Sequence, residues 1–112
     1  MPGSPSDRRT ASPPETGRIH VPVWAAPHRG TRTTTYTLIW SSAAPAAGYV
    51  FDVRVRKPGS TLWRQLRLGT EQRSGLFVPH GGVGVYRFEA RLRNGATGDA
   101  VRWSEPASIT VG

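Results

Sequence analysis

The residues of this sequence that could do chemistry are mainly arginines, which recur at alternate positions in two short segments, residues 49–56 and 85–93. The guanidinium group is planar and permanently charged, so it binds phosphate, sulfate or carboxylate through two parallel hydrogen bonds. An anion-binding face is therefore one interpretation of these segments. Its candidate residues are Arg54, Arg56, Arg87, Arg91 and Arg93.

Asp52 and Glu89 lie among these arginines and keep a second interpretation open. Like charges fixed opposite one another in a sheet are destabilising, and the two acids would relieve part of that cost. The face could then be only a solvated surface, on which long arginine stems cover the sheet. Aromatic residues on the same two segments fall on the opposite, inward side, which weakens the case for stacking on nucleic acid bases.

Other reactive groups are sparse and scattered. The three histidines, His20, His28 and His80, have no close metal-ligand spacing, and the chain contains no cysteine. The glycine run at residues 81–84 precedes an expected strand rather than a helix, and no nucleophile elbow is present. We therefore expect no catalytic site, no metal site and no cofactor.

The chain is strongly basic, with 15 Lys and Arg residues against 7 Asp and Glu residues and a net charge of +8. Such a charge attracts nucleic acid, anionic polysaccharide or acidic membrane surfaces. The dominance of arginine over lysine is equally typical of a coding sequence rich in G and C. No apolar run approaches the roughly 18 residues of a transmembrane helix, so membrane insertion is not expected.

The sequence divides into two parts at about residue 17. Residues 1–17 are rich in proline and serine, which predicts a flexible tail or linker. Residues 18–112 consist of short apolar-alternating runs separated by Gly, Pro and Asn, which predicts an all-β domain without helices. The seven predicted strands are residues 18–24, 33–41, 49–56, 62–68, 74–78, 85–93 and 107–111.

Seven strands with one apolar face each predict two sheets packed over a shared core. The largest inward side chains of that core are expected to be Trp40, Phe51, Tyr86 and Phe88. In the fourth predicted strand, the inward face is ambiguous between Leu62, Leu66 and Trp63.

The order and spacing of several short motifs resemble a fibronectin type III domain over residues 33–111. The motifs are Leu38-Ile39-Trp40-Ser41, residues 49–55, Trp63, Tyr86-Arg87-Phe88-Glu89-Ala90 and Trp103-Ser104-Glu105-Pro106. The resemblance implies a seven-stranded, immunoglobulin-like β-sandwich in which the third, fourth, sixth and seventh strands share one sheet. It also implies that the third and sixth strands are neighbours, which would gather the five arginines on one outer surface. Tyr86 would be the tyrosine-corner residue, with its hydroxyl bonded to upstream backbone.

The same resemblance implies a non-catalytic, extracellular or cell-surface module that serves as spacer, scaffold or protein-interaction domain. Its partner would be another protein or a covalently attached domain. The alternative is an arginine face that binds an anionic polymer such as a wall polymer, a glycan or a nucleic acid. The loop at residues 94–99 lacks the Arg-Gly-Asp of integrin-binding members, so that activity is not expected.

A second resemblance concerns residues 14–21, which are similar to the closing strand of bacterial plastocyanin-like copper domains. In secreted actinobacterial proteins such a domain can precede a sandwich that begins much like residues 30–35. The likeness suggests ancestry, context or truncation. No copper site of that type is expected, because the chain has no cysteine.

Overall fold

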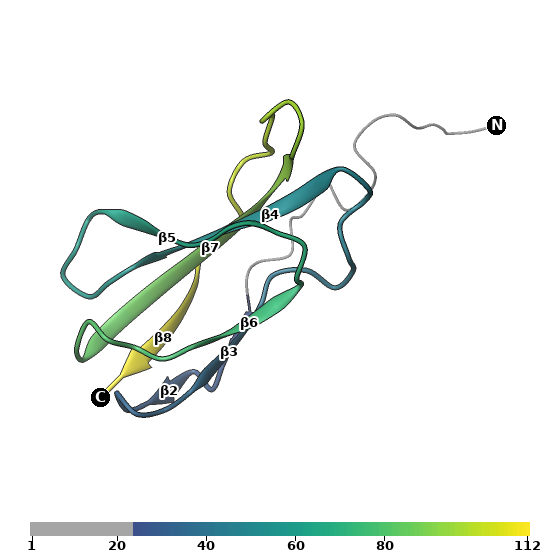
Figure 1. Ribbon diagram of the computed structural model, residues 1–112. Coiled ribbons are helices and arrows are strands. Elements are labelled where there is room, and N and C mark those ends of the chain that lie inside the picture. The colour runs from purple at the N-terminus through teal and green to yellow at the C-terminus, as the bar shows by residue number, and fades with distance from the viewer. Residues whose placement is uncertain (1–23) are drawn as a thin grey trace.

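The computed structural model describes residues 24–112, and within that range the regular structure consists of strands alone. Eight strands form a three-stranded sheet in the order β1-β3-β6 and a five-stranded sheet in the order β2-β8-β7-β4-β5 (Figure 1). The strands are β1 (Trp24–Ala26), β2 (Arg29–Gly30), β3 (Tyr36–Ile39), β4 (Tyr49–Arg56), β5 (Trp63–Thr70), β6 (Ser74–Phe77), β7 (Gly84–Asn94) and β8 (Ala107–Val111). The predicted all-β sandwich is confirmed.

The predicted strands and the observed ones agree most closely where the apolar alternation is strongest. β4 and β8 have the predicted bounds, and β3, β5, β6 and β7 differ from their predicted counterparts mainly at the ends. The eighth strand is β2, whose two residues pair in parallel with the last strand. The predicted tail, the copper-domain likeness, His20 and all of the first predicted strand except Trp24 lie outside the described residues.

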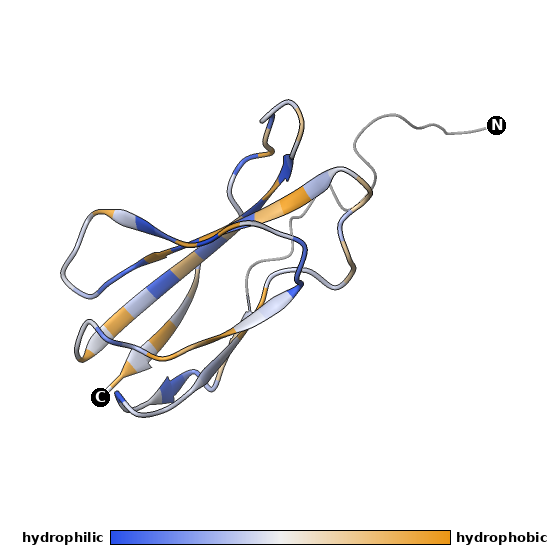
Figure 2. Cartoon of the chain, in the orientation of Figure 1, coloured by the Kyte–Doolittle hydropathy of each residue, from blue (hydrophilic) through white to orange (hydrophobic). Residues whose placement is uncertain are grey.

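β4 and β7 form the centre of the larger sheet and fix which side chains share a face. They pair antiparallel over eight positions, including Asp52 with Arg91 and Arg54 with Glu89. Because successive side chains in a strand point to opposite faces, the charged residues of both strands lie on one surface and the apolar residues lie on the other. Bands of differing hydropathy accordingly alternate along β7 (Figure 2). The strand order implied by the resemblance is therefore the observed one.

The core lies between the two sheets and contains the large residues that were expected there. Trp40, Phe51, Tyr86 and Phe88 are all buried. The indole of Trp40 also donates a hydrogen bond of 2.7 Å to the carbonyl of Gln72. Burying these side chains removes apolar surface from water, which is the main term that stabilises a domain of this size.

The ambiguity in the fourth predicted strand is resolved in favour of Leu66, which packs against the core. Leu62 precedes β5 and is 71% exposed. Trp63 lies three positions from Leu66, which in a strand places the two side chains on opposite faces. Trp63 is therefore on the outer face of the larger sheet.

Tyr86 has the geometry that the resemblance implied. Its hydroxyl donates a hydrogen bond of 2.7 Å to the carbonyl of Gly82, four residues upstream. Its ring meets Phe77 edge to face, with 5.5 Å between the ring centroids. The loop before β7 is thereby fixed to the core by one side chain.

A comparison of two phenylalanine substitutions tests this role. Tyr86→Phe should lower the free energy of unfolding by about 0.5–1.5 kcal/mol, because a partly buried hydrogen bond to the Gly82 carbonyl is lost. Tyr36→Phe is the matched control, since the Tyr36 hydroxyl is buried and has no hydrogen-bond partner among the described residues. That variant should be neutral or stabilising. Denaturant unfolding measures both, and a Tyr86→Phe variant no less stable than Tyr36→Phe would contradict the assignment.

Candidate functional site

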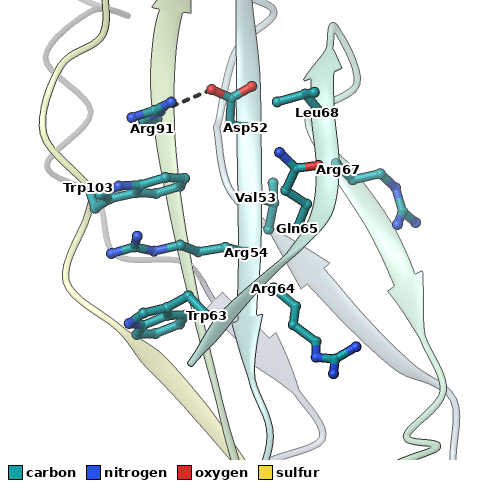
Figure 3. A pocket seen from close by; sticks show the side chains of 10 residues that line it. All are labelled: Asp52, Val53, Arg54, Trp63, Arg64, Gln65, Arg67, Leu68, Arg91 and Trp103. Carbon is teal, nitrogen blue, oxygen red and sulfur yellow. Dashed lines mark hydrogen bonds and ion pairs between the residues drawn. The ribbon is translucent and has the colours of Figure 1, made fainter. Parts of the chain in front are cut away.

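The outer face of the larger sheet carries a stack of alternating indole and guanidinium groups, which we call the tryptophan-arginine column. Its members are Arg91, Trp103, Arg54, Trp63 and Arg56. The guanidinium carbon of Arg54 lies 4.0 Å from the ring centroid of Trp103 and 4.6 Å from that of Trp63. Figure 3 shows Arg54 between the two indoles, with Arg91 on the far side of Trp103 at 4.5 Å. Arg56 lies 5.3 Å from the ring of Trp63.

Four segments of the chain bring this column together. β4 supplies Arg54 and Arg56, β7 supplies Arg91, and Trp63 opens β5. Trp103 comes from the irregular segment that leads into β8. The amides of Val101 and Ser104 hold that segment against β7 by donating to the carbonyls of Leu92 and Ala90, at 3.0 and 2.8 Å.

A buried carboxylate, Asp52, fixes the upper end of the column. Asp52 is only 2% exposed. Its Oδ1 accepts hydrogen bonds from the amide of Gly69 and from Arg93 Nη2, each at 3.0 Å. Its Oδ2 accepts from Arg91 Nε at 3.0 Å and from Arg93 Nε at 2.8 Å. Both oxygens are therefore fully used within the protein.

These hydrogen bonds determine the charge state of Asp52. Burial alone would raise the pKa of the carboxyl, but the hydrogen bonds from Arg93, Arg91 and the Gly69 amide outweigh it and hold the pKa below the ordinary value of 3.8. The pKa of Arg93 is raised by the same pairing. Asp52 is therefore a permanent anion at neutral pH.

The Gly69 amide reaches Asp52 because β5 is irregular beside it. The register between β4 and β5 shifts twice, between Phe51 and Val53 and again between Val53 and Arg54. Gly69 has a φ of 68°, a conformation that side chains with a Cβ rarely adopt. Such bulges re-aim backbone groups next to functional sites.

Glu89 neutralises the middle of the column. Its Oε1 accepts a hydrogen bond of 2.9 Å from Arg54 Nε and a second one from Arg54 Nη2. The guanidinium group of Arg54 is thus bound by the carboxylate of Glu89 and lies between two indoles.

All five arginines predicted from the sequence lie on this outer face, but they are not equivalent. Arg54, Arg91 and Arg93 are paired with Asp52 or Glu89. Arg56 and Arg87 lie opposite each other in the register of β4 and β7, and the described residues provide no ion pair for either. The face therefore carries five cations and two buried or half-buried anions, so it remains positive.

The sequence did not predict that Trp63 and Trp103 lie between the arginines of the column. Phe51, Tyr86 and Phe88 do point inward, but the interleaving aromatics come from neighbouring segments. Trp63 could have been found from its spacing to Leu66. Trp103 lies outside any strand, so no periodicity marks its direction.

The remaining candidate groups stay apart. His28 and His80 are exposed, and the described residues contain no cluster of three or more His, Cys, Asp or Glu residues that could hold a metal ion. No helix suited to crossing a membrane occurs in residues 24–112.

Replacing Asp52 by Asn tests whether this carboxylate organises the face. Removal of one partner from a buried ion pair costs about 3–5 kcal/mol, and the partial exposure of Arg91 and Arg93 places Asp52→Asn near the lower limit. Asp99→Asn removes the same charge from an exposed loop and should change stability by less than about 0.5 kcal/mol. Unfolding in urea at pH 7 measures both variants, and equal stabilities would contradict the role.

The lowered pKa adds a pH dependence with a definite sign. A carboxyl with a folded pKa below its unfolded value stabilises the protein above the unfolded pKa, at about pH 4. That contribution is lost as the pH falls through the folded pKa. The unaltered protein should therefore lose stability below about pH 4, and Asp52→Asn should lose less over the same interval. Parallel losses in both proteins would show that Asp52 is not the titrating group.

Comparisons with known proteins bear on the fold. No protein-family model matches the chain, and no curated protein matches it. Among solved structures, it is similar to the solution structure of the fibronectin type-III domain of human fibronectin type III domain containing protein 3. The TM-score is 0.56 and the sequence identity is 16%, over 80% of each chain. At this identity the likeness concerns architecture, and the chain has the fibronectin type III fold.

Proposed function

We propose that this chain is a non-catalytic module that acts as a spacer, scaffold or protein-interaction domain, and that it contacts partner proteins through the outer face of its larger sheet. The tryptophan-arginine column carries this proposal. Tryptophan and arginine are among the residues most enriched at the energetic centres of protein interfaces. Here both types are concentrated on one open face.

The column is also ordered before any partner arrives. A flexible side chain that becomes immobilised in an interface costs about 0.5–1.5 kcal/mol. Arg54 is already held by Glu89 and two indoles, and Arg91 is held by Asp52. The conformational entropy of these side chains is therefore lost when the domain folds, so a partner does not have to order them when it binds.

The path of the chain supports a spacer role. From Trp24 the chain passes through β1 into β2, which runs parallel to β8. The amide of Gly112 donates to the carbonyl of Gly30, so this path ends beside the last residue. Trp24 pairs with Ile39 at the other end of β3 from Tyr36, and the Tyr36 hydroxyl lies beside Gly30, so the first described residue is displaced along the sandwich from the last one. That arrangement suits a module joined in series to another domain.

A second candidate function is the binding of an anionic polymer on the same face. The observation in its favour is the pair Arg56 and Arg87, which face each other without a carboxylate partner among the described residues. Trp63 and Trp103 add aromatic groups beside the arginines, as polyanion-binding surfaces often have. The two functions predict different responses to removal of these charges.

Salt-dependent retention on heparin separates the two functions. The double variant Arg56→Gln and Arg87→Gln removes the two charges of the face that have no ion-pair partner within residues 24–112. The control is the double variant Arg29→Gln and Arg32→Gln. It removes two exposed charges at and just beyond β2, the edge strand of the larger sheet that lies away from β4 and β7. If the face serves proteins, both variants should elute earlier by the same amount, because only net charge has changed.

Specific polymer binding would give a different result. The slope of log affinity against log salt concentration would fall by about 2 for the face variant, because each missing arginine would leave one sulfate group of the polymer unbound. The control would keep nearly its full slope. That outcome would replace the protein-interaction proposal with the second candidate.

A further inference from the structure

Beside the tryptophan-arginine column lies a hollow of about 170 Å³, between the column and β5 (Figure 3). Leu68 and the indoles of Trp63 and Trp103 contribute apolar wall. An apolar cavity of about 150 Å³ is large enough to hold benzene. The hollow is therefore of a size to receive one aromatic or branched aliphatic side chain, and is smaller than the roughly 300 to 1,000 Å³ usual for pockets that take drug-sized molecules.

The shape of the hollow is set by the irregular path of β5 on one side and by a hydrogen-bonded side chain on the other. The two register shifts beside it bend β5 relative to β4, and Leu68 lies within the irregular part of the strand. The opposite wall is the column, in which Arg54 is held by Glu89. The hollow is thus built into the sheet and does not depend on a loose loop.

The charge around the hollow is of one sign. Arg54 and Arg91 extend their guanidinium groups along its column side, whereas those of Arg64 and Arg67 point away from the column (Figure 3). Asp52 is the single acidic residue among the described residues that line it, and both of its oxygens are occupied by Gly69, Arg91 and Arg93. Arg91 uses only its Nε in that pairing, and no hydrogen bond to another residue of the range 24–112 occupies its two amino groups. The rim therefore selects an anionic ligand.

Strand addition at the neighbouring edge is not the way to fill this hollow. β5 is the edge strand of the larger sheet, and its two register shifts interrupt the straight row of backbone groups that an added strand needs. A ligand must instead lie across the face, over the column and the hollow together.

We propose that the hollow receives one apolar side chain from an acidic segment of a partner protein, and that carboxylates flanking that side chain bind Arg91 at one end of the column and Arg56 at the other. This inference rests on the proposed protein-interaction function and names its partner class. An acidic protein segment supplies both an apolar side chain and carboxylates. A sulfated or phosphorylated polymer supplies the anions but nothing that would cover the apolar wall, so it fits the site less well.

Two nine-residue peptides of equal charge test the proposal on the full chain. Both consist of glutamates around one central residue, which is phenylalanine in one peptide and alanine in the other. Titrations followed by NMR report on the indole N–H groups of Trp63 and Trp103 and yield both dissociation constants. The phenylalanine peptide should bind about tenfold more tightly or better, because the apolar burial of its ring adds to a shared electrostatic term.

A matched pair of variants locates the effect. Leu68→Gln removes apolar wall from the hollow and should abolish most of the preference for phenylalanine. Leu76→Gln makes the same change on β6 of the other sheet, where the residue is 62% exposed against 60% for Leu68. That control should keep the full preference. A loss of preference in both variants would overturn the assignment of the hollow.

Three other outcomes would also overturn this inference. The first is equal affinity for the two peptides, and the second is no binding of either peptide at millimolar concentration. The third is a heparin oligosaccharide that binds more tightly than the phenylalanine peptide and whose binding depends on Leu68. The function proposed above is judged separately by the comparison of heparin elution, in which Leu68 is unchanged. The peptide titrations can therefore contradict the role of the hollow while the heparin comparison still supports the protein-interaction function, and the reverse can also occur.

Discussion

The outer face of this domain depends on one buried negative charge. Asp52 lies in β4, between β7 and β5, and a buried carboxylate in that position is tolerated only if it is paired and hydrogen-bonded. Three residues meet that demand together: Arg91 and Arg93 from the neighbouring strand and the amide of Gly69 from β5. Because all four acceptor positions are used, Asp52 ties three strands to a single geometry. The orientation of Arg91, and with it one end of the tryptophan-arginine column, follows from this requirement.

Much of this architecture follows from a two-residue rhythm in the sequence. Alternation fixed the bounds of β4 and β8 and placed the five arginines on one side of their strands, since the period of a strand leaves no other choice. The role of Asp52 could not be predicted in the same way. It depends on the register shifts of β5, which alternation does not reveal. The position of Trp103 was equally hidden, because backbone bonds from Val101 and Ser104 to β7 determine it.

Pairing within the column changes how the arginines contribute to function. Three of the five are bound to Asp52 or Glu89, so they act first as rigid parts of the surface and only second as donors to a ligand. A face of free arginines would bind any polyanion through its net charge. A face of paired arginines between indoles presents fixed shape, fixed donors and apolar edges at once. Those properties favour selective recognition of a protein over general attraction to a charged polymer.

The irregularity of β5 both hinders pairing of this edge strand with other chains and shapes the proposed binding site. An exposed edge strand invites pairing with other chains, and bulges are one of the means by which proteins prevent it. In this domain the same register shifts deliver the Gly69 amide to Asp52 and border the hollow beside the column. A straight β5 would offer a better edge for aggregation and would leave the buried carboxylate short of one donor. The feature that keeps other strands away therefore also shapes the place where a side chain of a partner can enter.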